Sequence, residues 1–342
     1  MAEHFWLGMM IALGSGILNG IFPWPMKYSR GWKWENTWAV FALVSTVLIP
    51  LSLAILFVPN LAQVYQGVSA RALCLPLLFG FLWGCAQTTL GLGFRAVGVA
   101  LGFSVVVGLN APIGSLIPLL VFHPEDLLRP RGILLLVSLP VLILGLWLYA
   151  TAGRRREKEL PPAATATDEP KPSFATGLAL CMFTGIFGAN INLGFAFGND
   201  VARKSLELGA NPVTATYPVW LLVMMAGFVP QALYCIYLLS RNHNWGLFKQ
   251  AGAGRETLLG IAMAALWASA IFSYGISATI AGKYGIAICY TLLVAMTIVA
   301  STGVGLLTGE WKGTSGGTRK ALFWAMAIVL ASVIILNLGG LF

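Results

Sequence analysis

The sequence is poor in charged residues. Only 10% of its 342 residues are Asp, Glu, Lys or Arg, while 58% are hydrophobic and the mean hydropathy is +0.82. Soluble globular domains carry about 25% charged residues, so this chain lacks the polar side chains needed to cover a surface in water. The composition excludes an ordinary soluble protein and indicates an integral membrane protein.

Motifs that carry enzyme chemistry are also missing. The three histidines have no partner at metal-binding spacing, and the sequence contains no Gly-x-Ser-x-Gly elbow and no P-loop. The five cysteines lie inside apolar runs without Cys-x-x-Cys spacing, which is typical of small space-filling residues. We therefore expect no enzyme activity, no metal and no cofactor, although residues distant in sequence could still meet in a membrane-embedded active site.

Apolar runs of about 20 residues recur along the whole chain. Each is long enough to cross ~30 Å of hydrocarbon as a helix. The predicted helices cover residues 5–26, 37–58, 72–95, 99–122, 132–152, 174–198, 213–239, 256–281, 284–308 and 320–341. The first run has no basic region before it and is long enough to span, so we expect it to be retained rather than cleaved as a signal peptide.

One long polar segment divides these helices into two groups of five. The stretch GRRREKELPPAATATDEPKPS, residues 153–173, is rich in Pro, Ala and charge and predicts a flexible linker. It separates an N-terminal five-helix repeat, residues 1–152, from a C-terminal five-helix repeat, residues 174–342.

The two halves share a sequence pattern. LWGCAQTTLGLGFRAVG (82–98) and LWASAIFSYGISATIAG (266–282) both read Leu-Trp-x7-Gly-x6-Gly and both join the third and fourth helices of their half. With 39 glycines a chance match is conceivable, but the equivalent positions favour duplication. Because five is odd, the two copies would enter the bilayer in opposite orientations, as in transporters that bind substrate near the midplane. The predicted fold is an all-α integral membrane protein of ten transmembrane helices in two inverted five-helix repeats.

Charge placement predicts the orientation. The net charge of +9 would fit nucleic-acid binding in a soluble protein, but here most basic residues lie in loops between apolar runs. They concentrate in the loops after helices 1, 3, 5, 7 and 9, which the positive-inside rule places in the cytoplasm. We therefore expect an inner (cell) membrane protein with both termini extracytoplasmic and no nucleic-acid partner.

The stretch KYSRGWKWENTW, residues 27–38, is then the first cytoplasmic turn. Its basic residues obey the charge rule, and Trp32, Trp34 and Trp38 are expected at the level of the lipid headgroups.

Polar and aromatic side chains within the predicted spans are candidates for substrate binding. Amides hydrogen-bond hydroxyl groups and aromatic rings pack against the C–H faces of sugars, which suggests a sugar site. The alternative is that the amides only join helices by hydrogen bonds. The candidates are Trp83, Gln87, Asn110, Asn190, Asn192, Trp267 and Tyr274.

None of the twelve carboxylates is central in a predicted span. A proton-coupled carrier needs a titratable group whose pKa changes with access, so the candidates lie at span ends. Glu35 is the first candidate, with Lys27 as an ion-pair partner, and Glu310 is a second. The alternative for Glu35 is an acid favoured in the first helical turn by the helix dipole.

Three tracts carry a family resemblance. PMKYSRGWKWENTW (25–38), LFGFLWGCAQTTLGLGFRAVGVALGFSVVVGL (78–109) and LLTGEWK (306–312), together with the ten-span layout, resemble the L-rhamnose–proton symporter family of the drug/metabolite transporter superfamily. The resemblance implies a carrier that imports a deoxyhexose with a proton by alternating access. It also implies that the first four helices of each half line the cavity. The family-motif positions are Lys27, Trp34, Glu35, Trp83, Glu310 and Trp311.

The predicted ninth helix departs from the family pattern. KYGIAICYTLLVAMTIV (283–299) contains no acid. Members of the family that this chain resembles carry acidic and aromatic residues near the start of the corresponding helix. Two alternatives therefore stay open: transport of a related monosaccharide instead of L-rhamnose, and weaker coupling to protons. The rival function is an exporter of amphipathic metabolites or drugs with the same fold, against which the lack of an intramembrane carboxylate argues.

Overall fold

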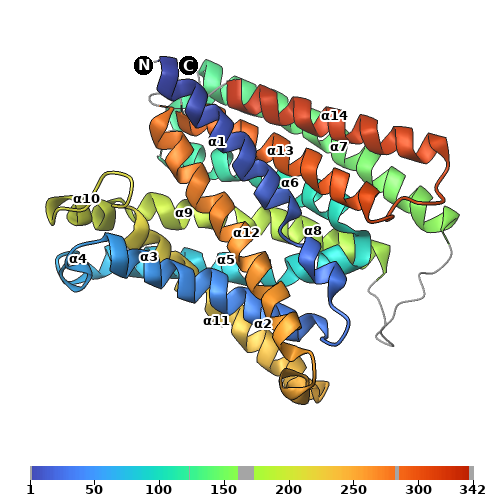
Figure 1. Cartoon of the computed structure of the whole chain (residues 1–342). Helices are drawn as coiled ribbons and strands as arrows, with labels where there is room; N and C mark the ends of the chain where they lie inside the picture. The colour runs from blue at the N-terminus through green and yellow to red at the C-terminus, as the bar shows by residue number, and fades with distance from the viewer. Residues whose placement is uncertain (1, 123, 161–172, 282–284, 339–342) are drawn as a thin grey trace. The chain divides into compact units, whose positions relative to one another are not determined.

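The computed structural model describes residues 2–122, 124–160, 173–281 and 285–338, and regular structure in these ranges is entirely helical (Figure 1). The elements of the first half are α1 (Ala2–Ile21), η1 (Trp24–Tyr28), α2 (Trp34–Leu43), η2 (Val44–Leu48), α3 (Ile49–Phe57), α4 (Leu61–Gln66), α5 (Ala70–Val97), α6 (Val99–Phe122), η3 (Pro124–Leu128) and α7 (Pro130–Glu159). The elements of the second half are α8 (Phe174–Gly188), α9 (Asn190–Phe197), α10 (Asn199–Glu207), α11 (Tyr217–Arg241), η4 (Asn244–Lys249), α12 (Ala253–Ile280), α13 (Gly285–Leu307) and α14 (Gly316–Leu338).

The predicted all-helical membrane class is confirmed. Among the described residues, 8 helical segments are long and apolar enough to cross a membrane. The segments containing α6 and α13 add shorter apolar stretches, Val99–Asn110 and Leu292–Leu307. Ten crossings arranged as inverted repeats therefore stay a prediction.

The fifth helix is longer than the sequence predicts. It continues to Glu159 instead of ending at 152, so the first residues of the predicted linker are helical. Basic residues in the last turn of α7, Arg156 and Lys158, complement the helix dipole and extend the helix. The rest of the predicted linker, residues 161–172, lies outside the described residues, as does Gly282 of the repeat.

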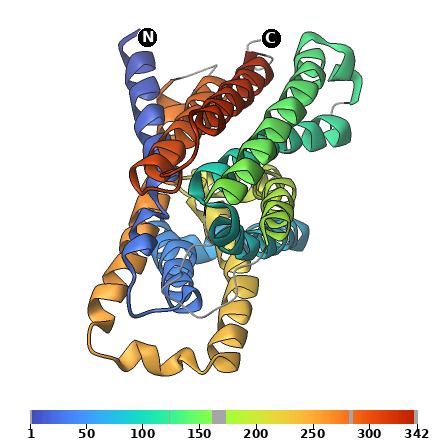
Figure 2. The ribbon, with the colours of Figure 1, turned by 90° about the vertical axis from the view of Figure 1, so that its right-hand side faces the viewer.

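The helices form two compact units, and each contains segments from both halves of the sequence. Unit 1 comprises Met1–Ile21, Thr89–Ile186 and Ala270–Phe342, and unit 2 comprises Phe22–Thr88 and Phe187–Ser269. Within unit 1, α7 runs alongside α14, and α1 runs alongside α13 (Figure 1 and Figure 2). Within unit 2, α2 packs against α11.

Two apolar segments are interrupted near their middle. The segment from α2 to α3 contains a π-helical turn, η2, where the hydroxyls of Ser45 and Thr46 donate to the carbonyls of Phe41 and Ala42 at 2.7 and 2.6 Å. The segment from α8 to α9 breaks at Ala189. Irregular backbone at membrane depth needs such local donors and occurs mainly where it lines a cavity or lies within protein.

Glycines allow neighbouring helices to pack closely in both units. In unit 2, a Cβ added at Gly80 or Gly84 of α5 would overlap the α11 backbone at Val223 or Gly227. In unit 1, Gly16 of α1 approaches the α13 backbone at Leu293 in the same way. The glycines therefore fix how closely neighbouring helices approach each other.

Replacing Gly84 by alanine should destabilise unit 2. The new methyl would overlap the Gly227 carbonyl, and backbone overpacking costs about 1–3 kcal/mol. We expect a lower midpoint of thermal unfolding in detergent. Gly14→Ala is the matched control, because a Cβ at helical Gly14 has nothing within 4 Å. Equal midpoints for the two variants would contradict the packing argument.

Candidate substrate-binding site and coupling carboxylates

Two of the predicted substrate-binding residues meet in unit 2. Trp83 on α5 and Trp267 on α12 stack with their ring centroids 6.0 Å apart and their planes at 21°. Both side chains are buried, with 3% and 8% of their surface exposed. The two tryptophans occupy equivalent positions in the sequence repeat, so the pattern that singled them out also describes a physical pair.

An aromatic run connects this pair to α2. Phe41 lies edge-on to Trp267 at 6.2 Å, and Trp38 lies 4.9 Å from Phe41. Trp34 stacks on Trp38 at 5.3 Å. Residues 34, 38 and 41 follow the helical spacing of one face, which is the sequence signal that could have identified Phe41 as part of this cluster.

The burial of three tryptophans is not predicted by the sequence. Trp32, Trp34 and Trp38 are 6%, 6% and 0% exposed, so they pack within the protein rather than facing lipid headgroups. The indole N–H of Trp32 donates to the Leu247 carbonyl at 3.0 Å. Helical segments from the second half cover these tryptophans, so packing within the protein explains them, and their depth in the bilayer stays a prediction.

Gln231 fixes the orientation of Trp38. It lies in the middle of α11 with 1% of its surface exposed, and its Oε1 accepts a hydrogen bond from Trp38 Nε1 at 3.1 Å. Its Nε2 donates to the Gly227 carbonyl at 3.0 Å. An amide with both ends satisfied is stable in an apolar interior, whereas an unpaired one is costly. Sequence reasoning missed Gln231 because its partner is far away in the chain.

Replacing Gln231 by leucine should destabilise the protein by about 1–3 kcal/mol, since it leaves the Trp38 N–H buried without its acceptor. The double variant Gln231→Leu/Trp38→Phe removes donor and acceptor together. We expect it to be more stable than the sum of the two single changes predicts. Thermal unfolding of the four proteins measures this coupling, and strictly additive effects would show that the hydrogen bond contributes nothing.

Glu35 is buried at the start of α2. Only 1% of the residue is exposed, and its Oε1 accepts hydrogen bonds from Asn242 Nδ2 at 3.0 Å and from Asn244 Nδ2 at 2.6 Å. Asn242 directly follows α11, and Asn244 is the first residue of η4. The position in the first turn agrees with the helix-dipole alternative, and the neutral amide partners were not predicted from the sequence. Lys27 is exposed on η1.

Glu310 occupies a different setting in unit 1. Its Oε1 accepts the backbone N–H of Val99, the first residue of α6, at 3.2 Å. On the other side of Gly98, which has φ +88°, Arg156 donates to the Val97 carbonyl at the end of α5 at 2.9 Å. The guanidinium also lies over the Trp311 ring at 5.3 Å. An anion at one helix start and a cation at the preceding helix end stabilise this junction.

The other predicted residues are dispersed. Gln87 is half-buried one turn beyond Trp83 on α5. At the break before α9, Asn190 donates to the Phe187 carbonyl at 2.7 Å, a local bond within the chain turn, and Asn192 is exposed. In unit 1, Asn110 is half-buried on α6, and the Tyr274 ring lies 5.8 Å from that of Tyr290.

Comparisons with known proteins agree along the full length. A family model described as L-rhamnose-proton symport protein (RhaT) matches residues 1–341. The L-rhamnose-proton symporter of Mannheimia succiniciproducens is 25% identical over 96% of this chain and 99% of the relative. The proteins of the same name from Escherichia coli O1:K1 / APEC and Yersinia pestis (strain Pestoides F) are 23% and 27% identical, covering 99% and 97% of this chain and the same shares of each relative.

Proposed function

Since the chain belongs to the L-rhamnose-proton symport protein family, we propose that it imports L-rhamnose, or a closely related deoxyhexose, together with a proton. As a member of this family it is a membrane transporter rather than an enzyme. The names of its relatives favour proton-coupled import over the export of amphipathic metabolites or drugs.

The sugar would pack against the Trp83–Trp267 pair. A deoxyhexose carries C–H faces and a methyl group that suit aromatic rings, and hydroxyls that suit an amide such as Gln87. The single observation that carries this proposal is the stacking of two tryptophans from equivalent repeat positions. Because both rings are buried, the pair is closed in this structure, and a change of conformation must expose it, as alternating access requires. Asn110, Asn190, Asn192 and Tyr274 stay secondary candidates.

Glu35 is the proposed proton carrier. Its Oε1 accepts hydrogen bonds from two neutral amides, those of Asn242 and Asn244, and it is a buried acid at the start of a helix that also carries aromatic residues of the proposed site. The adjacent Trp34 belongs to the aromatic run that reaches Trp267, so sugar contact and protonation would act on the same helix, α2. In this proposal Lys27 pairs with Glu35 in another conformation. Glu310 is the weaker candidate because its junction with α6 already explains its presence.

A ligand-stabilisation screen tests the substrate. We expect L-rhamnose to raise the midpoint of thermal unfolding of the purified protein more than D-glucose or D-galactose does. Stabilisation by a related deoxyhexose alone would move the assignment to that sugar. No shift with any monosaccharide, together with stabilisation by lipophilic cations, would favour the exporter.

The proposed arrangement in the membrane has ten crossings, two inverted repeats and both termini outside the cytoplasm of an inner membrane. Its support is the concentration of basic residues in alternate loops. A tag at either terminus that is protected in intact cells and becomes accessible only after lysis would contradict it.

A further inference from the structure

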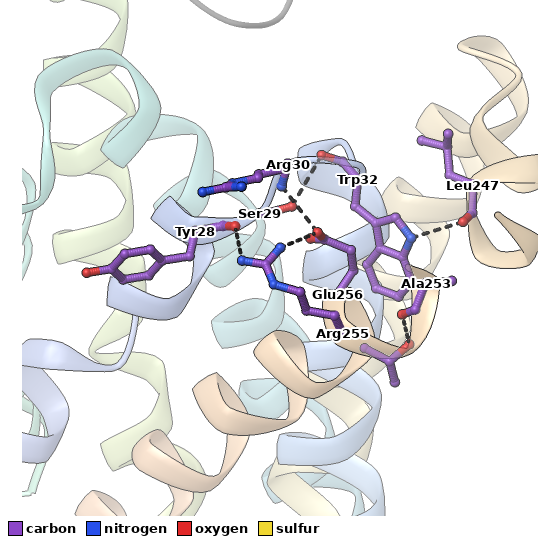
Figure 3. A network of polar contacts seen from close by, with 9 residues as sticks. Tyr28, Ser29, Arg30, Trp32, Leu247, Ala253, Arg255 and Glu256 are labelled. Atoms are coloured by element: carbon purple, nitrogen blue, oxygen red, sulfur yellow. Dashed lines mark hydrogen bonds and ion pairs between the residues drawn. The ribbon is translucent and has the colours of Figure 1, made fainter. Parts of the chain in front are cut away.

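A second polar network lies in unit 2, apart from the tryptophan pair. It surrounds a cavity of about 260 Å³ bounded by the loop between η1 and α2, the end of η4 and the start of α12. Arg30, Trp32, Arg255 and Glu256 are among the lining residues. Figure 3 shows the side chains of Arg255, Glu256 and Trp32 gathered beside this loop. Figure 2 shows η4 joining the ends of α11 and α12.

Glu256 presents an unused acceptor at this cavity. It is 5% exposed, and its Oε1 accepts the backbone N–H of Arg30 at 3.2 Å and Arg255 Nη1 at 3.0 Å (Figure 3). The Ser29 hydroxyl and the Gly31 N–H also face the carboxylate, but its Oε2 has no hydrogen-bond partner within 3.5 Å among the described residues. Buried carboxylate oxygens normally accept hydrogen bonds, so this atom calls for a donor from a molecule in the cavity.

Two arginines line this cavity, and the guanidinium of Arg255 lies beside the Glu256 carboxylate. Arg255 also donates through Nη2 to the Tyr28 carbonyl at 3.0 Å, which fixes the side chain while leaving 51% of it exposed. Arg30 is exposed, and only its backbone N–H is used by Glu256. Two arginines against one carboxylate leave a net positive cavity. Guanidinium groups bind the oxygens of phosphate through paired hydrogen bonds.

The cavity lies at the ends of apolar helical segments, which in a bilayer are the parts nearest to the lipid headgroups. The two segments are Trp34–Phe57 and Ala253–Ser277. Trp32 forms a rigid wall because its indole N–H is bonded to Leu247 and its ring packs edge-on against Phe248 at 5.0 Å. Basic pockets between membrane helices at this level are typical sites for lipid headgroups.

We propose that this cavity binds the headgroup of a phospholipid. The phosphodiester contacts Arg30 and Arg255, and a hydrogen-bond-donating terminal group, the ammonium of ethanolamine or a hydroxyl of glycerol, reaches Oε2 of Glu256. A choline headgroup offers the same phosphate but has no N–H or O–H to donate. The site therefore prefers phosphatidylethanolamine and phosphatidylglycerol to phosphatidylcholine.

The test uses the full-length protein in detergent, freed of native lipid and titrated with the three lipids carrying identical acyl chains. Native mass spectrometry measures the bound fraction. We expect phosphatidylethanolamine and phosphatidylglycerol to bind about tenfold more tightly than phosphatidylcholine, the effect of one hydrogen bond to a charged group. Equal binding of all three lipids would overturn the proposal.

Variants locate the binding to this cavity. Arg30→Ala keeps the backbone N–H that Glu256 uses, and it should weaken binding of all three lipids about tenfold. Glu256→Gln should reduce the preference for ethanolamine over choline. Lys249→Ala is the control, since Lys249 is an exposed cation of η4 outside the lining. If Lys249→Ala weakened lipid binding as much as Arg30→Ala does, the lipid assignment would be overturned. Displacement of the lipid by millimolar inorganic phosphate alone would also overturn it.

Discussion

Glu35→Gln is expected to abolish accumulation of sugar driven by a proton gradient while leaving sugar exchange largely intact. Glutamine keeps the size of the side chain and an oxygen that accepts from Asn242 and Asn244, but it carries no proton. With one proton per sugar, each unit of pH difference supports about tenfold accumulation, because one unit corresponds to about 1.4 kcal/mol. For Glu35→Gln the ratio of internal to external sugar should therefore stay at about one. Labelled-sugar uptake into proteoliposomes, with and without a pH difference, measures this.

Two controls accompany this experiment. Glu35→Asp retains a carboxylate and should keep part of the gradient-driven accumulation. Glu207→Gln removes an exposed carboxylate that pairs with Lys204, and it should behave like the unmodified protein. Accumulation by Glu35→Gln at the unmodified level would place proton coupling at another residue.

Replacing Trp267 by leucine is expected to have the second large effect, on sugar affinity. The change removes the ring that stacks on Trp83 and the edge contact with Phe41. Loss of an aromatic face against the sugar should lower the apparent affinity by up to about tenfold, since such contacts contribute about 0.5–1.5 kcal/mol beyond the buried area. Trp267→Phe keeps an aromatic ring, so its apparent affinity for the sugar should fall only severalfold. Exchange uptake over a range of sugar concentrations measures the affinity.

A comparison with another tryptophan separates sugar binding from general stability. Trp324 on α14 is 67% exposed in the structure and faces away from its own unit, so Trp324→Leu should leave affinity unchanged. Thermal unfolding without sugar shows how far Trp267→Leu weakens the fold. If Trp267→Leu and Trp324→Leu had the same apparent affinity, the stacked pair would not be the sugar site.

The sequence predicts the helical class and the equivalence of Trp83 and Trp267 because both follow from regular patterns, whereas the contact between the two rings is seen only in the structure. Hydrophobic run length predicts helices, and the repeat places the two tryptophans at equivalent positions. Glu35 was singled out by its charge beside an apolar run. Its burial depends on Asn242 and Asn244, which come from the other half of the chain and follow no spacing rule.

The remaining differences also come from contacts between distant segments. In the sequence nothing distinguishes Gln231 from other residues of its helix, and only the structure shows that Trp38 donates a hydrogen bond to it. The sequence does not show that Glu310 accepts the backbone N–H at the start of α6, and its role in coupling stays a prediction. Glu256 at the start of α12 is not a candidate from sequence, because its burial and its bonds to Arg30 and Arg255 depend on how loops fold back. Hydrophobic periodicity and motif spacing do not predict such contacts between residues far apart in the sequence.

Uptake of labelled L-rhamnose into proteoliposomes containing the purified protein tests the central claim of proton-coupled sugar import most directly. With an acidic exterior, the internal sugar should rise above the external concentration, and collapse of the pH difference by a protonophore should return the two to equality. Rhamnose levels that never exceed the external concentration at any imposed pH difference would contradict proton-coupled import by this chain.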